Sequence, residues 1–307
     1  MSVDASSVKE LRERTGAGMM DCKRALGESN GDLDKAISLL REKGLASAAK
    51  KAGRVAAEGL VSTFTNDDHT RAVVAELNCE TDFVAKTPEF GNLLATIGEA
   101  LLVANGIALE GDGAAAGSLK LPSGKSLAEV LNEAVASIGE HIALRRYTRI
   151  DAPDGRVGSY VHAGGKIGVL VEVAGANAKH EDVLRSLAMQ IAAAMPRHVR
   201  REEVTAADLA GEREIFRSQA AATGKPANVV EKIVDGKVEK FYREVCLLEQ
   251  EYVRDPQLTV DKLLAAEAKQ SGCSLTVRRF VRYQLGEGLE KRTSNLAAEV
   301  AEQLAKG

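Results

Sequence analysis

The chain has 307 residues, of which 45% are hydrophobic and 4% aromatic, and it contains no tryptophan. This length favours about two to four structural units, and a core built from Leu, Val, Ile and Ala favours helices. The 41 basic residues nearly balance the 44 acidic ones and are scattered along the chain. Because nucleic-acid-binding proteins usually gather a basic excess on one face, we expect no direct contact with nucleic acid.

The first residues, MSVDASSVKELRER, contain no apolar run behind a basic start, which predicts that the chain has no signal peptide. No stretch approaches the ~20 apolar residues that a membrane span requires. We therefore expect a cytoplasmic protein that does not associate with a membrane. The cysteines, which are widely spaced and lack a CxxC pair, favour reduced thiols over a disulfide framework or a metal site. They are Cys22, Cys79, Cys246 and Cys273.

Residues 4–44 show the apolar periodicity of three short amphipathic helices separated by two turns. In the second helix, Met19, Cys22 and Leu26 recur at spacings of three and four, which places them on one face. Gly44 is expected to end the third helix. The pattern predicts a small three-helix module followed by an exposed helical linker.

Two alternating runs at 60–64 and 72–77 flank a polar turn and predict a β-hairpin. The polar segment NCETDFVAK follows. Thr87 and Pro88 then begin a helix, because they supply a capping hydroxyl and a proline in the first turn. A similar strand-strand-helix pattern recurs at 156–195, which predicts a core of two similar subdomains.

Residues 201–246 depart from this pattern, since two apolar helical runs flank a turn at 223–226. They predict a helical hairpin that protrudes as an arm. A further strand is expected over 274–285, with a break at 286–288, and a last helix is expected from Asn295.

Together these elements predict an α+β fold with an N-terminal three-helix module, two similar strand-strand-helix subdomains, a protruding helical hairpin and a C-terminal helix. The expected domains are 1–55 for the module and linker, 56–155 for the first core subdomain, 156–200 with 247–285 for the second, 201–246 for the arm and 286–307 for a C-terminal module.

The residues that could carry chemistry do not form a recognisable active site. Gly124-Lys125-Ser126 ends like a phosphate-binding P-loop, but Leu119 stands where that motif requires glycine. We interpret 123–126 as a turn and helix cap. The run 79–82 contains potential metal ligands, yet four adjacent residues rarely converge on one ion. The histidines are dispersed and no nucleophile stands beside a base, so we expect no enzyme, cofactor or metal.

The segment Thr81-Asp82-Phe83-Val84 is more informative, because it places a carboxylate beside a large apolar ring at a strand-to-helix junction. Two interpretations are open. In one, Phe83 folds back into the core and Asp82 caps a turn. In the other, both side chains project into a partner protein, where aromatic anchors supply much of the binding energy.

Four segments resemble the elongation factor Ts family, in the order VKELRERTGAGMMDCKRAL, NCETDFVAK, GSYVHAGGKIGVLV and RRFVRYQLGEGLEK. The resemblance covers nearly the whole chain except about 105–125, a Gly- and Ala-rich insertion of the kind that longer members carry. It implies a guanine nucleotide exchange factor that acts on elongation factor Tu, in its GDP-bound and nucleotide-free states, during translation elongation. The alternative is a binding or chaperone-like module for elongation factor Tu without exchange activity.

The resemblance also assigns contact positions in the N-terminal part of the chain. In the family, a three-helix module similar to ubiquitin-associated domains docks on the GTPase domain of elongation factor Tu. Arg12, Met19 and Met20 match its contact positions. Met20 lies off the apolar stripe and is expected to be exposed, where its adaptable thioether suits a contact. For Met19, a place in the core is an equally open interpretation.

The TDFV segment, Thr81 to Val84, matches the family without change. The resemblance implies that Asp82 and Phe83 enter the partner beside its nucleotide and displace the groups that hold Mg²⁺ and the diphosphate. His162 matches a contact position toward a different domain of elongation factor Tu, although a surface histidine without a role is the alternative. Residues 201–246 match an arm through which some members self-associate.

Overall fold

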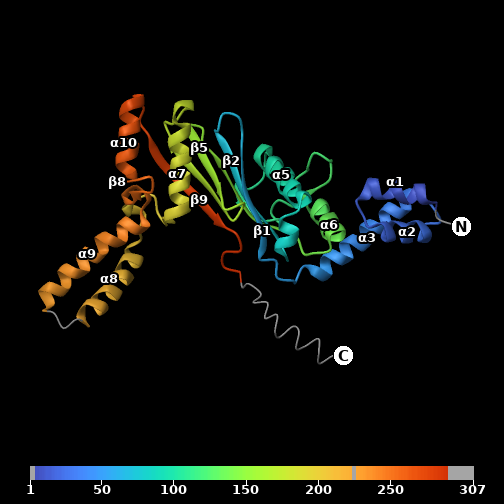
Figure 1. Cartoon of the computed structure of the whole chain (residues 1–307), viewed down its shortest axis with the longest axis horizontal. Coiled ribbons are helices and arrows are strands. Elements are labelled where there is room, and N and C mark those ends of the chain that lie inside the picture. The colour runs from blue at the N-terminus through green and yellow to red at the C-terminus, as the bar shows by residue number, and fades with distance from the viewer. Residues whose placement is uncertain (1–3, 223–225, 290–307) are drawn as a thin grey trace. The chain divides into compact units, whose positions relative to one another are not determined.

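The computed structural model describes residues 4–222 and 226–289 (Figure 1). The chain forms two compact units, each assembled from separate segments. The first comprises Met1–Leu60, Ala75–Tyr147 and Gln284–Gly307, and the second comprises Val61–Val74 and Thr148–Tyr283. Helices and strands are mixed, as the α+β prediction requires. These units do not coincide with the expected domain ranges, so the finer division stays a prediction.

The N-terminal module consists of α1 (Ala5–Thr15), α2 (Met19–Glu28) and α3 (Leu33–Lys51), which confirms the three predicted helices. Their small core contains the fully buried Leu11, Cys22 and Leu26. The Asp32 carboxylate caps α3 by accepting a hydrogen bond from the Lys35 amide at 3.0 Å. The apolar periodicity of the sequence was therefore sufficient to predict the helices of this module.

Two details of the module differ from the prediction. Met19 does not share the buried face of Cys22 and Leu26, since its side chain is 56% exposed. It is the first residue of α2, and side chains tilt toward the N-terminus of a helix, which directs this one past the helix end. Gly44 does not end α3, because residues 45–51 are mostly good helix formers. It lies where α3 passes α6 (Leu127–Ile138), and an added Cβ would be 3.4 Å from that of Ala136.

The largest sheet has the strand order β1-β2-β4-β3. The predicted hairpin strands are β1 (Glu58–Thr65) and β2 (Arg71–Cys79). The sequence reading missed β4 (Ala143–Asp151), which pairs beside β2, and β3 (Glu110–Gly111). Helix α5 (Pro88–Val103) begins where predicted, with the Thr87 hydroxyl accepting a hydrogen bond from the Phe90 amide, and it buries Phe90, Leu94, Ile97 and Leu101.

The Gly- and Ala-rich stretch packs onto the first unit. It contributes β3 and the fully buried Ala116, and the Tyr147 hydroxyl donates a hydrogen bond to the Ala108 carbonyl at 3.1 Å. Ser126 caps α6 in a capping box with Glu129, which confirms the predicted turn and helix cap.

The second unit contains the predicted second strand-strand-helix pattern. Strands β5 (Gly155–His162) and β6 (Ile167–Ala174) pair antiparallel, and β9 (Thr276–Gln284), also predicted, extends the sheet in the order β5-β6-β9. Helix α7 (Glu181–Ala194) packs on β5 and β6. An added Cβ on Gly158 would lie 2.5 Å from the Leu184 carbonyl, so glycine permits this close approach of strand and helix.

The sequence reading missed the elements between the arm and β9, namely β7 (Glu251–Tyr252), β8 (Asp255–Thr259) and α10 (Val260–Ser271). The structure also describes three short 3₁₀ helices: Ala178–His180, Arg201–Glu203 and Leu247–Glu249.

The arm is the predicted helical hairpin, formed by α8 (Ala206–Ala221) and α9 (Ala227–Val245), which lie side by side in Figure 1. Its own apolar core includes Ala220, Val230 and Val234. Residues 223–225 of its predicted turn and the predicted helix from Asn295 lie outside the described residues, as does most of the expected 286–307 module. None of the helices that the structure describes is long and apolar enough to cross a membrane.

Candidate partner-binding site

The TDFV segment forms a single helical turn between β2 and α5. Thr81 has an extended backbone, and its hydroxyl caps helix α4 (Asp82–Ala85) by accepting a hydrogen bond from the Val84 amide at 3.4 Å. Ala85 is buried, which anchors the inner side of the turn, while Val84 is half-buried. The Thr81 cap and the buried Ala85 leave Asp82 and Phe83 on the outer side of the turn.

The Phe83 ring is 80% exposed, so it does not fold back into the core. Asp82 is not the cap of the turn, since Thr81 performs that role. The Asp82 carboxylate instead pairs with the Lys86 ammonium at 2.6 Å; the Lys86 side chain is 74% exposed and that of Asp82 46%. Exposed ion pairs of this kind contribute about 0–1 kcal/mol, so a partner could replace this one at little cost.

The backbone that carries the turn is braced from behind by residues that the sequence reading missed. The Glu140 carboxylate accepts hydrogen bonds from the Glu80 and Thr81 amides and from the Thr81 hydroxyl. The Glu80 carboxylate accepts one from the His141 amide at 2.7 Å. No local pattern connects 80–81 with 140–141. The only feature of the sequence that could have drawn attention to Glu140 is its position just after Gly139, the C-cap of α6.

Cys79 lies beneath the turn. Its thiol is buried and donates a hydrogen bond to the Thr81 carbonyl at 3.1 Å. Burial, reinforced by the negative charge of Glu140, raises the pKa of the Cys79 thiol to about 12. The group therefore stays protonated and acts as a structural donor. All four cysteines are free, in agreement with the predicted thiols.

The other predicted contact residues of the first unit lie in the three-helix module. Arg12 is exposed on α1. Met19 and Met20 begin α2 and are 56% and 68% exposed, which is unusual for large apolar side chains. Met20 is thus exposed as expected, and the structure decides against a core position for Met19.

In the second unit, His162 is the last residue of β5 and its side chain is exposed. Its Nδ1 atom is hydrogen-bonded to the Tyr160 hydroxyl at 3.0 Å, and the two ring centroids lie 5.8 Å apart. The tyrosine therefore orients an imidazole that is accessible to solvent.

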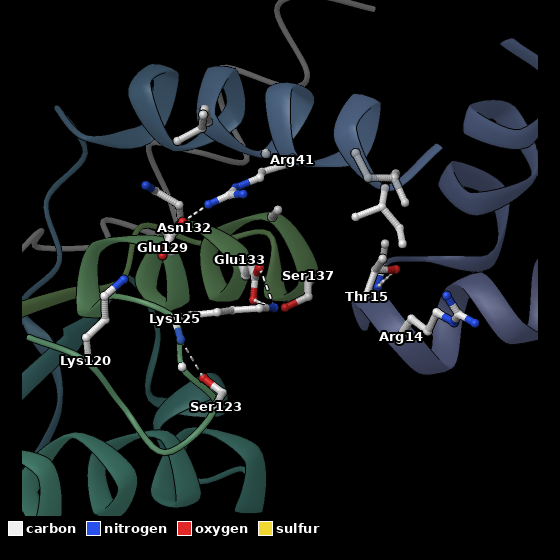
Figure 2. Close-up of a pocket in the computed structure, with 17 residues that line it drawn as sticks. Arg14, Thr15, Arg41, Lys120, Ser123, Lys125, Glu129, Asn132, Glu133 and Ser137 are labelled. Atoms are coloured by element: carbon white, nitrogen blue, oxygen red, sulfur yellow. Dashed lines mark hydrogen bonds and ion pairs between the residues drawn. The ribbon is translucent and has the colours of Figure 1, made fainter. Parts of the chain in front are cut away.

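A pocket of about 440 Å³ in the first unit is lined in part by Gly124 and Lys125 of the P-loop-like run (Figure 2). Two of its cations pair with carboxylates that also line the pocket. The Lys125 ammonium pairs with Glu133 at 2.7 Å, as Figure 2 shows, and the Arg41 guanidinium pairs with Glu129. The Ser126 amide donates to the Glu129 carboxylate at 2.8 Å, so the helix start is already occupied by an acidic group. This arrangement disfavours a phosphate, which needs unpaired donors and cations.

Large apolar side chains presented to solvent, one of them on a braced turn beside a carboxylate, are the features of a protein-binding factor. The family profile described as Elongation factor TS matches residues 80–287. The chain belongs to the elongation factor Ts family, whose members act in translation elongation.

Named relatives match over essentially the full length. They include elongation factor Ts of Clostridioides difficile (strain 630), 49% identical with 99% of each chain covered. The protein of Clostridium botulinum (strain Eklund 17B / Type B) is 48% identical over 99% of this chain and 100% of its own. That of Trichlorobacter lovleyi is 47% identical over 98% of each.

Proposed function

We propose that this chain is a guanine nucleotide exchange factor that binds elongation factor Tu and promotes GDP release during translation elongation. Membership of the elongation factor Ts family supports this role. The observation that carries the mechanism is the Phe83 ring, exposed on a braced helical turn beside the Asp82 carboxylate. No covalent step is involved, and the chain acts as a binding protein and not as an enzyme.

The energetics of the exposed ring favour insertion into a partner. Transfer of a phenylalanine side chain from water to an apolar site is worth roughly 1.5–3 kcal/mol. Because the Thr81 cap and the bonds to Glu140 already hold the turn, little backbone freedom is lost when the partner binds. Phe83 and Asp82 together therefore make a wedge, the name used below for this pair.

The wedge promotes release through thermodynamic coupling. It enters elongation factor Tu beside the nucleotide and displaces the groups that hold Mg²⁺ and the diphosphate. If the chain binds the nucleotide-free partner more tightly than the GDP-bound one, GDP must bind the complex more weakly by the same factor. A coupling free energy of about 3 kcal/mol corresponds to roughly 150-fold weaker GDP binding. The nucleotide and the ion belong to the partner.

Contacts away from the wedge supply affinity. Arg12, Met19 and Met20 bind the GTPase domain of elongation factor Tu, where flexible thioethers adapt to the partner's surface. His162 contacts another domain of the same partner. The arm at 201–246 carries self-association of the chain. The protein acts in the cytoplasm without direct contact with nucleic acid or membrane.

The test is stopped-flow release of fluorescent GDP from elongation factor Tu. We expect large acceleration by the unmodified chain and loss of most of it in Asp82→Ala/Phe83→Ala, with binding retained. Val103→Ala is a matched control, because Val103 is an exposed apolar residue of α5 in the same unit. It should accelerate release normally.

A different result would favour the second class of function. If the unmodified chain binds elongation factor Tu but leaves the GDP release rate unchanged, it is a binding or chaperone-like module without exchange activity. If the unmodified chain and the double variant accelerate GDP release equally well, the exchange role is supported but Asp82 and Phe83 do not promote release.

A further inference from the structure

Glu140 makes an unusual set of hydrogen bonds to the segment that precedes the wedge. It follows Gly139, whose φ of 90° ends α6 and directs the chain toward β4. One oxygen of its carboxylate accepts from the Thr81 hydroxyl at 2.6 Å. The other accepts from the Glu80 and Thr81 amides, each at 3.0 Å. Hydrogen bonds to an ionised carboxylate are roughly twice as strong as neutral ones.

The same two segments are also bonded in the opposite direction. The Glu80 carboxylate accepts from the His141 amide at 2.7 Å and pairs with the Arg54 guanidinium at 3.3 Å. His141 Nδ1 in turn donates to the Arg54 carbonyl at 2.8 Å. The Glu140 carboxylate thus bonds the backbone of residues 80–81, and the Glu80 carboxylate bonds the backbone of His141. Bonds in both directions between the two segments fix the position and the orientation of residues 80–81.

This bracing reaches the wedge through Thr81. Because its hydroxyl hydrogen points to Glu140, the oxygen lone pairs remain available to accept from the Val84 amide. That bond is the cap that sets the helical turn of Asp82–Ala85. An unbraced turn of this length would have to be ordered during binding, and each residue fixed would then cost conformational entropy.

We propose that Glu140 is a positioning residue for nucleotide exchange: its carboxylate orders residues 80–84 before the partner arrives, so that the wedge enters in the productive geometry. The inference rests on the proposed exchange function and adds a residue outside the TDFV segment to it. Glu140 acts through Thr81 and is not itself inserted into the partner.

The test compares Glu140→Ala, Glu140→Gln and Glu133→Ala. For each, GDP release from elongation factor Tu is measured over a range of factor concentrations, and amide hydrogen exchange of residues 80–85 is measured in the free protein. Glu133 is a matched control, because it lies on α6, is half-buried and pairs with Lys125 instead of the turn. Thermal melts establish that each variant is folded.

For Glu140→Ala we expect faster amide exchange at 81–84 and a saturating GDP release rate lower by on the order of 10- to 100-fold, because a displacement of about 1 Å in a positioned group can cost this much. The half-saturating concentration should change little, because the contacts of the three-helix module are untouched. Glu140→Gln retains one acceptor oxygen for the two amides and should recover part of the rate. Glu133→Ala should match the unmodified chain.

A saturating rate of Glu140→Ala within about twofold of the unmodified chain would overturn the positioning role, as would a fall in rate without faster amide exchange at 81–84. These outcomes are distinct from failure of the proposed function, in which the unmodified chain itself would not accelerate GDP release.

Discussion

Phe83 and Phe90 show how environment gives the same side chain different roles. They occupy the adjacent helices α4 and α5, but Phe90 is fully buried whereas Phe83 is largely exposed. Phe90→Ala should lower the free energy of unfolding by about 3–5 kcal/mol, since it leaves a cavity. Phe83→Ala should change it by less than about 0.5 kcal/mol while slowing GDP release. Urea unfolding and stopped-flow release measure the two effects. Comparable destabilisation by both variants would show that the Phe83 ring packs in the core.

The cysteines should differ in reactivity for a physical reason that can be checked. The thiolate is the reactive form, and burial raises the pKa of Cys79 to about 12 and that of Cys246 to about 11. A raised pKa lowers the thiolate fraction at any given pH, so both should resist alkylation at pH 8. Cys273 is half-buried and should react first with iodoacetamide. Peptide mass mapping over time gives the order, and equal labelling of Cys79 and Cys273 would contradict the buried position of Cys79.

At the scale of elements, the sequence predicted the helices and strands that are specified by residues close together in the chain. The three N-terminal helices, the hairpin β1–β2, the second strand-strand-helix pattern and the arm follow from apolar periodicity and turn residues. Strand β4 was missed because Arg145 and Arg146 interrupt its apolar alternation. Those charges are acceptable in the sheet because both guanidinium groups pair with Glu76 of β2, a partner distant in sequence.

The residues of the candidate site likewise fall into some that the sequence predicted and some that required the structure. Thr81 to Val84 are consecutive, so one segment revealed them, whereas Glu140 belongs to another part of the chain and becomes visible through its hydrogen bonds alone. The exposure of the Met19 side chain was likewise established by the structure and not by the sequence. Periodicity placed Met19 on the buried face of α2, but periodicity does not register that a first-turn side chain points past the helix end.

The Glu76 cluster gives an element-scale prediction. Glu76 is fully buried and accepts hydrogen bonds from Arg145, Arg146 and the Gly286 amide at 2.9, 2.6 and 2.8 Å. Glu76→Ala removes the shared acceptor of two partly buried cations. We expect a loss of about 3 kcal/mol in the free energy of unfolding, the lower end for a broken buried pair because both arginines retain some solvent contact.

Glu172 of β6 is the control for that prediction. It occupies the corresponding position in the second strand-strand-helix pattern and pairs with Arg279 at 2.8 Å, but this arginine is about half exposed. Glu172→Ala should therefore cost about 1 kcal/mol or less. Both values come from urea unfolding. Equal losses for the two variants would show that burial of the acceptor does not determine the cost.

For the whole molecule, the proposal assigns different tasks to different parts of the chain. Under the proposal, the contacts of the three-helix module persist whether or not the partner holds GDP and contribute equally to both complexes. The wedge, under the same proposal, is fully engaged only as GDP leaves. Contacts that are equal in both complexes, such as those of the module, set the concentration at which the factor saturates its partner. Contacts made only as GDP leaves, such as those of the wedge, set the GDP release rate at saturation.

This separation predicts opposite kinetic signatures for two variants. Met20→Ala removes an exposed thioether and should raise the half-saturating factor concentration severalfold with an unchanged saturating GDP release rate. Asp82→Ala/Phe83→Ala should lower the saturating rate with a smaller change in half-saturation. Stopped-flow titration of elongation factor Tu·GDP gives both constants, with Val103→Ala again as the control. If Met20→Ala lowers the saturating rate as strongly as the wedge variant, the module also takes part in displacing GDP, and the two tasks are not divided between these parts of the chain.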